Sequence, residues 1–162
     1  MTTPQPAHGT VLPEWIDHNG HMNVAYYVLA FDLSLMTFFD EFGLDQNYRD
    51  STGCSTFTGD LHIYYKRELH EGDDFTVTHT LLGFDEKRIR YMSQMHRADD
   101  GSEVAIQEAI SLHVDLTERR VCPMREPLVS GLIARQARQG PFTVPPEIGR
   151  TIEKPRIFRG GI

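Results

Sequence analysis

The polar side chains that could do chemistry gather in one short run, Asp17-His18-Asn19-Gly20-His21-Met22-Asn23. A carboxylate, two imidazoles and two amides so close together could supply a nucleophile or general base with an orienting partner. An apolar stripe follows directly and predicts a helix, whose first N–H groups are free and whose positive end favours developing negative charge. The run is therefore a candidate site that combines a base or nucleophile with an oxyanion site. The alternative is a polar loop with an ordinary helix cap.

The element that must position this loop is a long helix, predicted over 24–42. Asn23 is a suitable N-cap, and Gly43 can end the helix in a left-handed conformation. Apolar residues recur at helical spacing along one side and predict one buried stripe. Its members are Val24, Tyr27, Val28, Phe31, Leu35, Phe38, Phe39 and Phe42.

The chain on either side of this helix favours strands. A short first strand is predicted over 11–16, and later strands over 55–66, 75–82, 87–97 and 104–115. Strict alternation in 55–66 would place Asp60 and His62 on the face opposite Phe57, Leu61, Ile63 and Tyr65. In 104–115, one apolar face is interrupted by Glu108 and otherwise consists of Val104, Ile106, Ile110, Leu112 and Val114.

Short connections between these strands favour antiparallel neighbours, and one long helix must bury its stripe on one sheet face. The predicted fold class is α+β, a curved antiparallel sheet around one central helix. The predicted domain covers residues 1–125. Residues 126–162 form a basic extension, with a short helix over 127–139 and then an irregular tail. The edge strands of such a sheet have unpaired backbone groups that favour contact with a second subunit, so a homodimer or homotetramer is expected.

Composition excludes several classes of protein. Residues 1–118 carry a net charge of −13 and residues 119–162 a net charge of +6, which argues against a basic nucleic-acid-binding core. No apolar run is long enough to span a membrane. The two cysteines, Cys54 and Cys122, form neither a disulfide framework nor a CxxC zinc pair. His18 and His21 have no evident third ligand, so no metal or cofactor is expected. A cytoplasmic location is predicted.

The run over 11–27, VLPEWIDHNGHMNVAYY, resembles the opening signature of the hot-dog-fold acyl-CoA thioesterases, the 4-hydroxybenzoyl-CoA thioesterase-like family. The resemblance extends over about residues 8–124. It implies that Asp17 attacks the thioester carbonyl or activates a water molecule. It further implies that the Val24 N–H polarises the thioester oxygen and that His21 and Asn23 orient the loop or the water.

A narrower resemblance concerns residues 14–23, which are similar to betainyl-CoA thioesterases of carnitine breakdown, either separate or fused to carnitine dehydrogenase. It implies that Asp60 and His62, on the strand after the helix, belong to the substrate site; a solvated strand face is the alternative. A trimethylammonium acyl group would be held by aromatic faces. The candidates for these faces are Trp15, Tyr26 and Tyr27.

Coenzyme A is strongly anionic and needs a local basic patch. The candidates are Lys87, Arg88, Arg90 and Arg120, with solvated hairpin ends as the alternative. The predicted function is hydrolysis of a small acyl-CoA. The alternatives are a hot-dog acyl-CoA hydratase or dehydratase and a non-catalytic acyl-CoA-binding module.

Overall fold

The computed structural model of the chain describes residues 7–152. Three α-helices and six strands occur in this range, together with one short 3₁₀ helix at Pro13–Trp15. The helices are α1 (Val24–Asp40), α2 (Gln46–Thr52) and α3 (Leu128–Arg138). The strands are β1 (Ala7–Thr10), β2 (Cys54–Tyr65), β3 (Asp74–Phe84), β4 (Arg88–Arg97), β5 (Glu103–Asp115) and β6 (Arg120–Val121).

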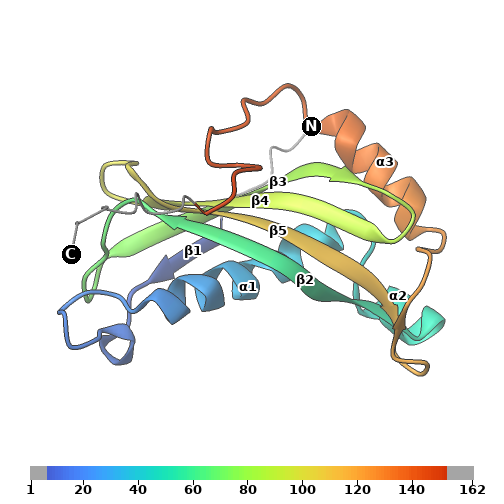
Figure 1. The fold of residues 1–162 in the computed structure, drawn as a ribbon, viewed down its shortest axis with the longest axis horizontal. Coiled ribbons are helices and arrows are strands. Elements are labelled where there is room, and N and C mark those ends of the chain that lie inside the picture. The colour runs from blue at the N-terminus through green and yellow to red at the C-terminus, as the bar shows by residue number, and fades with distance from the viewer. Residues whose placement is uncertain (1–6, 153–162) are drawn as a thin grey trace, which may run out of the picture.

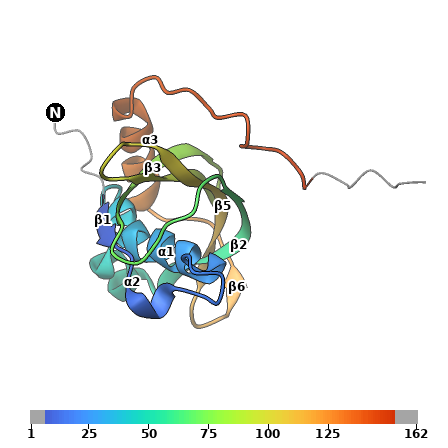
Figure 2. The same cartoon turned by 90° about the vertical axis from the view of Figure 1, so that its left-hand side faces the viewer.

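The strands form one antiparallel sheet with the order β1-β3-β4-β5-β2, and the short β6 pairs with β5. Figure 1 shows this sheet curving over α1, and Figure 2, turned by 90°, shows the helix inside the curl. The sheet follows from tight turns between β3, β4 and β5, which force neighbouring strands to run in opposite directions. The predicted α+β class, with a curved antiparallel sheet around one central helix, is confirmed.

Helix α1 begins where the sequence predicts and ends at Asp40, two residues before the predicted end. The Asn23 side chain accepts a hydrogen bond from the Ala25 N–H at 3.0 Å, and Gly43 adopts a φ of +89° just beyond the helix. The residues on its inner face are buried against the sheet, which removes large apolar side chains from water. They include Tyr27, Ala30, Phe31, Leu35, Phe38 and Phe39.

The first strand lies earlier in the chain than predicted. The strand is Ala7–Thr10, which pairs with β3, and the segment predicted as strand over 11–16 contains the 3₁₀ turn Pro13–Trp15. Pro13 has no N–H to donate to a strand partner, and its fixed φ suits the first position of a helical turn. The prediction over 11–16 is therefore wrong, and Ile16 forms a single bridge with Met22 instead.

A bulge in β2 changes which residues share a face. The register against β5 shifts between Thr58 and Asp60, so Gly59 is the extra residue of a β-bulge. Thr58 and Leu61 consequently line the same pocket beside α1, whereas the Phe57 ring lies beneath the Arg119 guanidinium. Phe57 does not share a face with Leu61 as strict alternation had predicted, because the bulge reverses the alternation.

Helix α3, predicted over 127–139, is found at Leu128–Arg138. Leu128 and Leu132 are fully buried in the same cluster as Phe39 and Phe42 of the main domain. The proposed boundary at residue 125 therefore separates two parts of the chain that share one hydrophobic core.

The chain after α3 crosses the outer face of the sheet, the face opposite α1 (Figure 1). The Gly149 N–H donates to the Glu108 carboxylate at 2.5 Å, and Glu147 pairs with Lys66 at 2.7 Å. The predicted irregular tail is irregular through residue 152, and its remainder, 153–162, lies outside the described residues. Within residues 7–152, no helix is both long and apolar enough to cross a membrane.

Candidate active site

The Asp17 loop is a small turn closed by main-chain hydrogen bonds. The Asp17 N–H donates to the His21 carbonyl at 3.0 Å, and the Gly20 N–H donates to the Asp17 carbonyl at 3.0 Å. Gly20 has a φ of +82°, a conformation that glycine adopts without a steric penalty. The bridge between Ile16 and Met22 closes the base of this turn directly before α1. The turn therefore fixes Asp17 at the N-terminal end of the helix.

The Asp17 carboxylate is held in its ionised form. The Asn19 N–H donates to Oδ1 at 2.8 Å, and this bond is the main reason that the pKa of Asp17 lies below its usual 3.8. Burial opposes this shift, and the nearby imidazoles of His21 and His18 assist it. The side chain is 15% exposed. Asp17 is thus a charged, reachable carboxylate at neutral pH, as a nucleophile or general base requires.

Asn23 connects this carboxylate to the helix. Its Oδ1 caps α1, while its Nδ2 lies 3.5 Å from Asp17 Oδ2 in a long hydrogen bond. Val24 follows at the first position of the helix, where backbone N–H groups have no acceptor within the helix. His21 Nδ1 lies 4.0 Å from Asp17 Oδ1 and 3.3 Å from the Met22 carbonyl. The structure thus brings all four predicted catalytic residues together at one helix end.

The predicted aromatic residues lie beside this end of α1 and are largely packed against one another. Trp15 and Tyr26 stack with ring centroids 5.4 Å apart, and Trp15 also approaches Phe75 at 6.4 Å. Tyr27 is 3% exposed and accepts a hydrogen bond from the Leu69 N–H. Tyr27 is therefore a core residue in this chain, whereas Trp15 and Tyr26 are half-buried near the Asp17 loop.

Asp60 and His62 lie after the β2 bulge, on the outer face of the sheet. His62 Nδ1 is 3.2 Å from the Arg150 carbonyl, and its ring lies 4.4 Å from that of Tyr64. The exposed Asp60 carboxylate accepts a hydrogen bond from the Leu61 N–H. Within this one chain, these two residues are on the opposite side of the sheet from α1, and their proposed substrate role remains a prediction.

Two of the predicted coenzyme-binding residues are already paired with carboxylates. Arg88 pairs with Asp85 at 2.5 Å, and Arg90 donates from Nε to Glu108 at 2.7 Å. Lys87 and Arg120 are exposed near the same end of β4 and β5. The paired arginines would have to exchange partners to meet a phosphate, so their role also remains a prediction.

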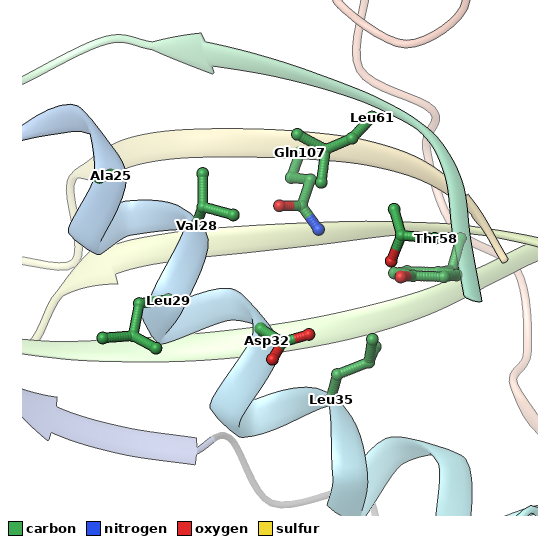
Figure 3. Close-up of a pocket in the computed structure, with 9 residues that line it drawn as sticks. Ala25, Val28, Leu29, Asp32, Leu35, Thr58, Leu61 and Gln107 are labelled. Atoms are coloured by element: carbon green, nitrogen blue, oxygen red, sulfur yellow. The ribbon is translucent and has the colours of Figure 1, made fainter. Parts of the chain in front are cut away.

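A pocket of about 370 Å³ opens between α1 and β2, beginning one residue after Val24. Figure 3 shows Asp32 on the helix and Gln107 on β5 both directed into it. Gln107 is 4% exposed, and its Oε1 has no hydrogen-bond partner among the described residues. The lining residues are Ala25, Val28, Leu29, Asp32, Leu35, Thr58, Leu61, Tyr91 and Gln107.

Motif analysis missed this pocket because its lining comes from four separate elements. The available signal was Asp32, the one charged residue in the first sixteen positions of α1. A carboxylate at an otherwise uncharged helix face is a candidate functional group, because an isolated charge has no structural need to be there.

A long helix inside a curled antiparallel sheet defines the hot-dog fold, and in this chain a carboxylate loop lies at the N-terminus of that helix. Residues 11–132 match the thioesterase-like superfamily. The chain therefore belongs to that superfamily and is a thioesterase. This membership favours the hydrolase over the hydratase and binding-module alternatives.

Individual relatives agree with this assignment. The chain is 33% identical over 147 residues to betainyl-CoA thioesterase of Pseudomonas aeruginosa, covering 91% of this chain and 92% of that protein. It is 34% identical to L-carnitine dehydrogenase/betainyl-CoA thioesterase of Agrobacterium fabrum, of which it covers 29%. A structure of a hypothetical protein from Staphylococcus aureus in complex with CoA superimposes with a TM-score of 0.86 at 28% identity, covering 96% of this chain and 99% of that one.

Proposed function

We propose that this thioesterase hydrolyses an acyl-CoA, with Asp17 as the reacting carboxylate. The observation that carries the proposal is the geometry at the start of α1. There an ionised, partly exposed Asp17 lies at the N-terminal end of α1, where Val24 is the first helical residue, and a pocket opens directly beyond Val24. A carboxylate, an oxyanion site and an acyl-sized cavity are the three parts that thioester hydrolysis needs.

Two reaction courses use these parts. In the first, Asp17 takes a proton from water as the oxygen attacks the carbonyl carbon, and the coenzyme leaves as a thiol or thiolate. In the second, Asp17 attacks the carbonyl carbon itself, and water then hydrolyses the resulting anhydride. In both courses the Val24 N–H would donate to the carbonyl oxygen as negative charge develops there. Asn23 and His21 would orient the carboxylate or the water.

The first-choice acyl group is betainyl, which is what the relatives named above act on. The Asp32 carboxylate and the unpartnered Gln107 oxygen give the pocket a negative character that suits a trimethylammonium group. The length of the pocket favours a second candidate. Its lining follows α1 from Ala25 to Leu35, about 15 Å of helix, which also suits a longer apolar acyl chain.

Thiol release from a panel of thioesters tests the substrate class. Betainyl-CoA should be hydrolysed with a higher kcat/KM than benzoyl-CoA or medium-chain acyl-CoAs. A preference for a neutral chain would exclude the cationic substrate and leave the thioesterase activity in place. No thiol release from any acyl-CoA in the panel would contradict the proposed function itself.

The Asp17→Asn variant tests the catalytic assignment in the same assay. Its kcat should fall by roughly 10²–10⁴-fold, the usual contribution of a general base, with an unchanged circular dichroism spectrum. The matched control is Asp100→Asn, because Asp100 accepts the Ser102 N–H in the same way within a remote turn. Full activity in Asp17→Asn would remove Asp17 from the mechanism.

We also propose that the protein forms a homodimer or homotetramer in the cytoplasm. Strand β2 is a sheet edge that carries the exposed side chains Phe57, Leu61 and Tyr65. Unpaired edges with apolar side chains favour a partner. Both cysteines are free thiols, which agrees with a reducing compartment.

A further inference from the structure

Three soft donor groups meet at the end of the sheet farthest from the Asp17 loop. Cys54 begins β2, His113 lies near the end of β5, and Cys122 directly follows β6. Their ligand atoms all lie within 4.8 Å of one another. Cys54 and His113 are fully buried, and Cys122 is half-buried. Although the two cysteines are far apart in the sequence, the strand pairing brings them together.

The register explains why an ion suits this cluster better than a disulfide. Val114 of β5 pairs with Ser55 of β2 on one side and with Val121 of β6 on the other. Cys54 thus begins one strand that flanks β5, and Cys122 directly follows the strand on the other side; two strands that flank a third are about 9.5 Å apart. A disulfide requires Cα atoms within roughly 7 Å, whereas a metal ion can bridge two sulfur atoms over a wider separation.

The orientation of the His113 ring is fixed by Tyr48, which contacts Nε2. The Tyr48 hydroxyl lies 3.0 Å from Nε2 and itself accepts the Arg125 N–H at 3.2 Å. The other ring nitrogen, Nδ1, lies 3.4 Å from the Cys122 sulfur and 3.0 Å from the Cys122 carbonyl. An outer partner on one imidazole nitrogen, with the second nitrogen directed at the other ligands, is typical of metal-binding histidines.

We propose that Cys54, Cys122 and His113 bind one Zn²⁺ ion. Two thiolates and an imidazole are ligands that zinc prefers, and its tetrahedral geometry places sulfur atoms about 3.7 Å apart, a small contraction of the cluster. On binding, both thiols lose a proton, and the histidine proton lies on Nε2, from which it is donated to the Tyr48 oxygen. A water molecule can take the fourth position from the side of the half-buried Cys122.

The role of such an ion would be structural. It would join β2, β5 and β6 at the point where the chain passes from α2 into β2. The whole length of α1, about 25 Å, separates this end of the molecule from Asp17. The reacting carboxylate would therefore not contact the ion.

Metal titration of the untagged full-length protein tests the site. After treatment with a chelator and reductant, the protein should take up one equivalent of Zn²⁺ in competition with a chromophoric chelator. With Co²⁺ as a probe, thiolate-to-cobalt charge transfer and the visible bands of a tetrahedral site should appear. Zinc should also raise the Tm. The absence of stoichiometric binding would overturn the proposal.

Variants assign the ligands. Cys122→Ser and Cys54→Ser should each weaken Zn²⁺ binding by more than the roughly 10–100-fold that loss of an outer partner costs, and Tyr48→Phe should fall within that range. The half-buried Cys122 keeps the test usable if Cys54→Ser fails to fold. The matched control is His96→Gln, a histidine outside the cluster, which should bind as the parent does. Equal binding in Cys122→Ser, or a mass loss of two hydrogens from a Cys54–Cys122 disulfide in untreated protein, would contradict the zinc site.

Discussion

At the scale of single residues, His79 is a titratable group whose ionisation is strongly affected by folding. It belongs to β3, and its ring lies between α1 and β4, with Nε2 2.9 Å from the Ser34 hydroxyl and Nδ1 2.8 Å from that of Ser93. Its ring stacks on Phe38 at 5.2 Å. Burial lowers the pKa of His79 from 6.5 to about 4, because a charged imidazole would lose its hydration there.

This shift makes stability depend on pH. Below pH 6.5 the unfolded chain binds a proton at His79 that the folded chain does not bind until about pH 4. The contribution of the neutral His79 to the free energy of unfolding is complete above pH 6.5. As the pH falls, the free energy of unfolding decreases, by about 3 kcal/mol at pH 4. Urea unfolding at pH 7.5 and at pH 4.5 should show this loss. The loss should be smaller in His79→Gln and unchanged in the control His70→Gln, which replaces an exposed histidine. Equal losses in the two variants would contradict the assignment of this pH dependence to His79.

The arrangement of the Asp17 loop could be predicted residue by residue, but the pocket could not. Asp17 and Asn23 contact residues that are only a few positions away in the sequence, so their spacing alone indicates how they are arranged. Asp32, Tyr91 and Gln107 come from α1, β4 and β5, and they meet because the sheet curls. The same holds for Cys54 and Cys122, whose proximity depends on the β5 register.

At the scale of elements, periodicity predicted the long helix and four of the strands, and local backbone chemistry produced the errors. Pro13 converts a predicted strand into a 3₁₀ turn, and Gly59 introduces a bulge that reverses the faces of β2. Helix α2 was missed because Gln46–Thr52 is short and polar apart from Tyr48. Its buried Tyr48 and the Asp45 cap at 2.8 Å stabilise it through contacts that no periodic pattern displays.

The docking of α3 depends on Gly131. A Cβ atom there would lie 2.0 Å from the Phe42 carbonyl oxygen, so the two backbones touch. In an exposed helix, replacing glycine by alanine stabilises by about 1 kcal/mol. Gly131→Ala should instead destabilise, near the upper end of the roughly 1–3 kcal/mol that overpacking costs. Thermal unfolding would show this, with Gln136→Ala on the exposed side of α3 as a neutral control. Stabilisation by Gly131→Ala would contradict the close approach.

At the scale of the whole molecule, the sheet is contacted on both faces within one chain. Helix α1 fills the inner face, and the segment before residue 152 crosses the outer face through Gly149 and Glu147. Apolar side chains remain uncovered on the outward side of α1 and along the edge strand β2, on both sides of the pocket. Those on α1 are Val24, Leu29, Leu33 and Met36. A second subunit placed there would close the pocket and would thereby link assembly to activity.

The Leu33→Glu variant tests this link. Leu33 is 65% exposed on α1 and does not line the pocket, so its replacement acts on the surface alone. Loss of about 2 kcal/mol of apolar burial would raise the dissociation constant of the assembly about 30-fold, and a buried carboxylate would raise it further. Sedimentation equilibrium should show smaller species, and kcat/KM should fall in parallel because the pocket is left open. Ile133→Glu on α3, where the parent side chain is 56% exposed, is the matched control and should change neither property. An unchanged assembly in Leu33→Glu would place the interface elsewhere on the molecule.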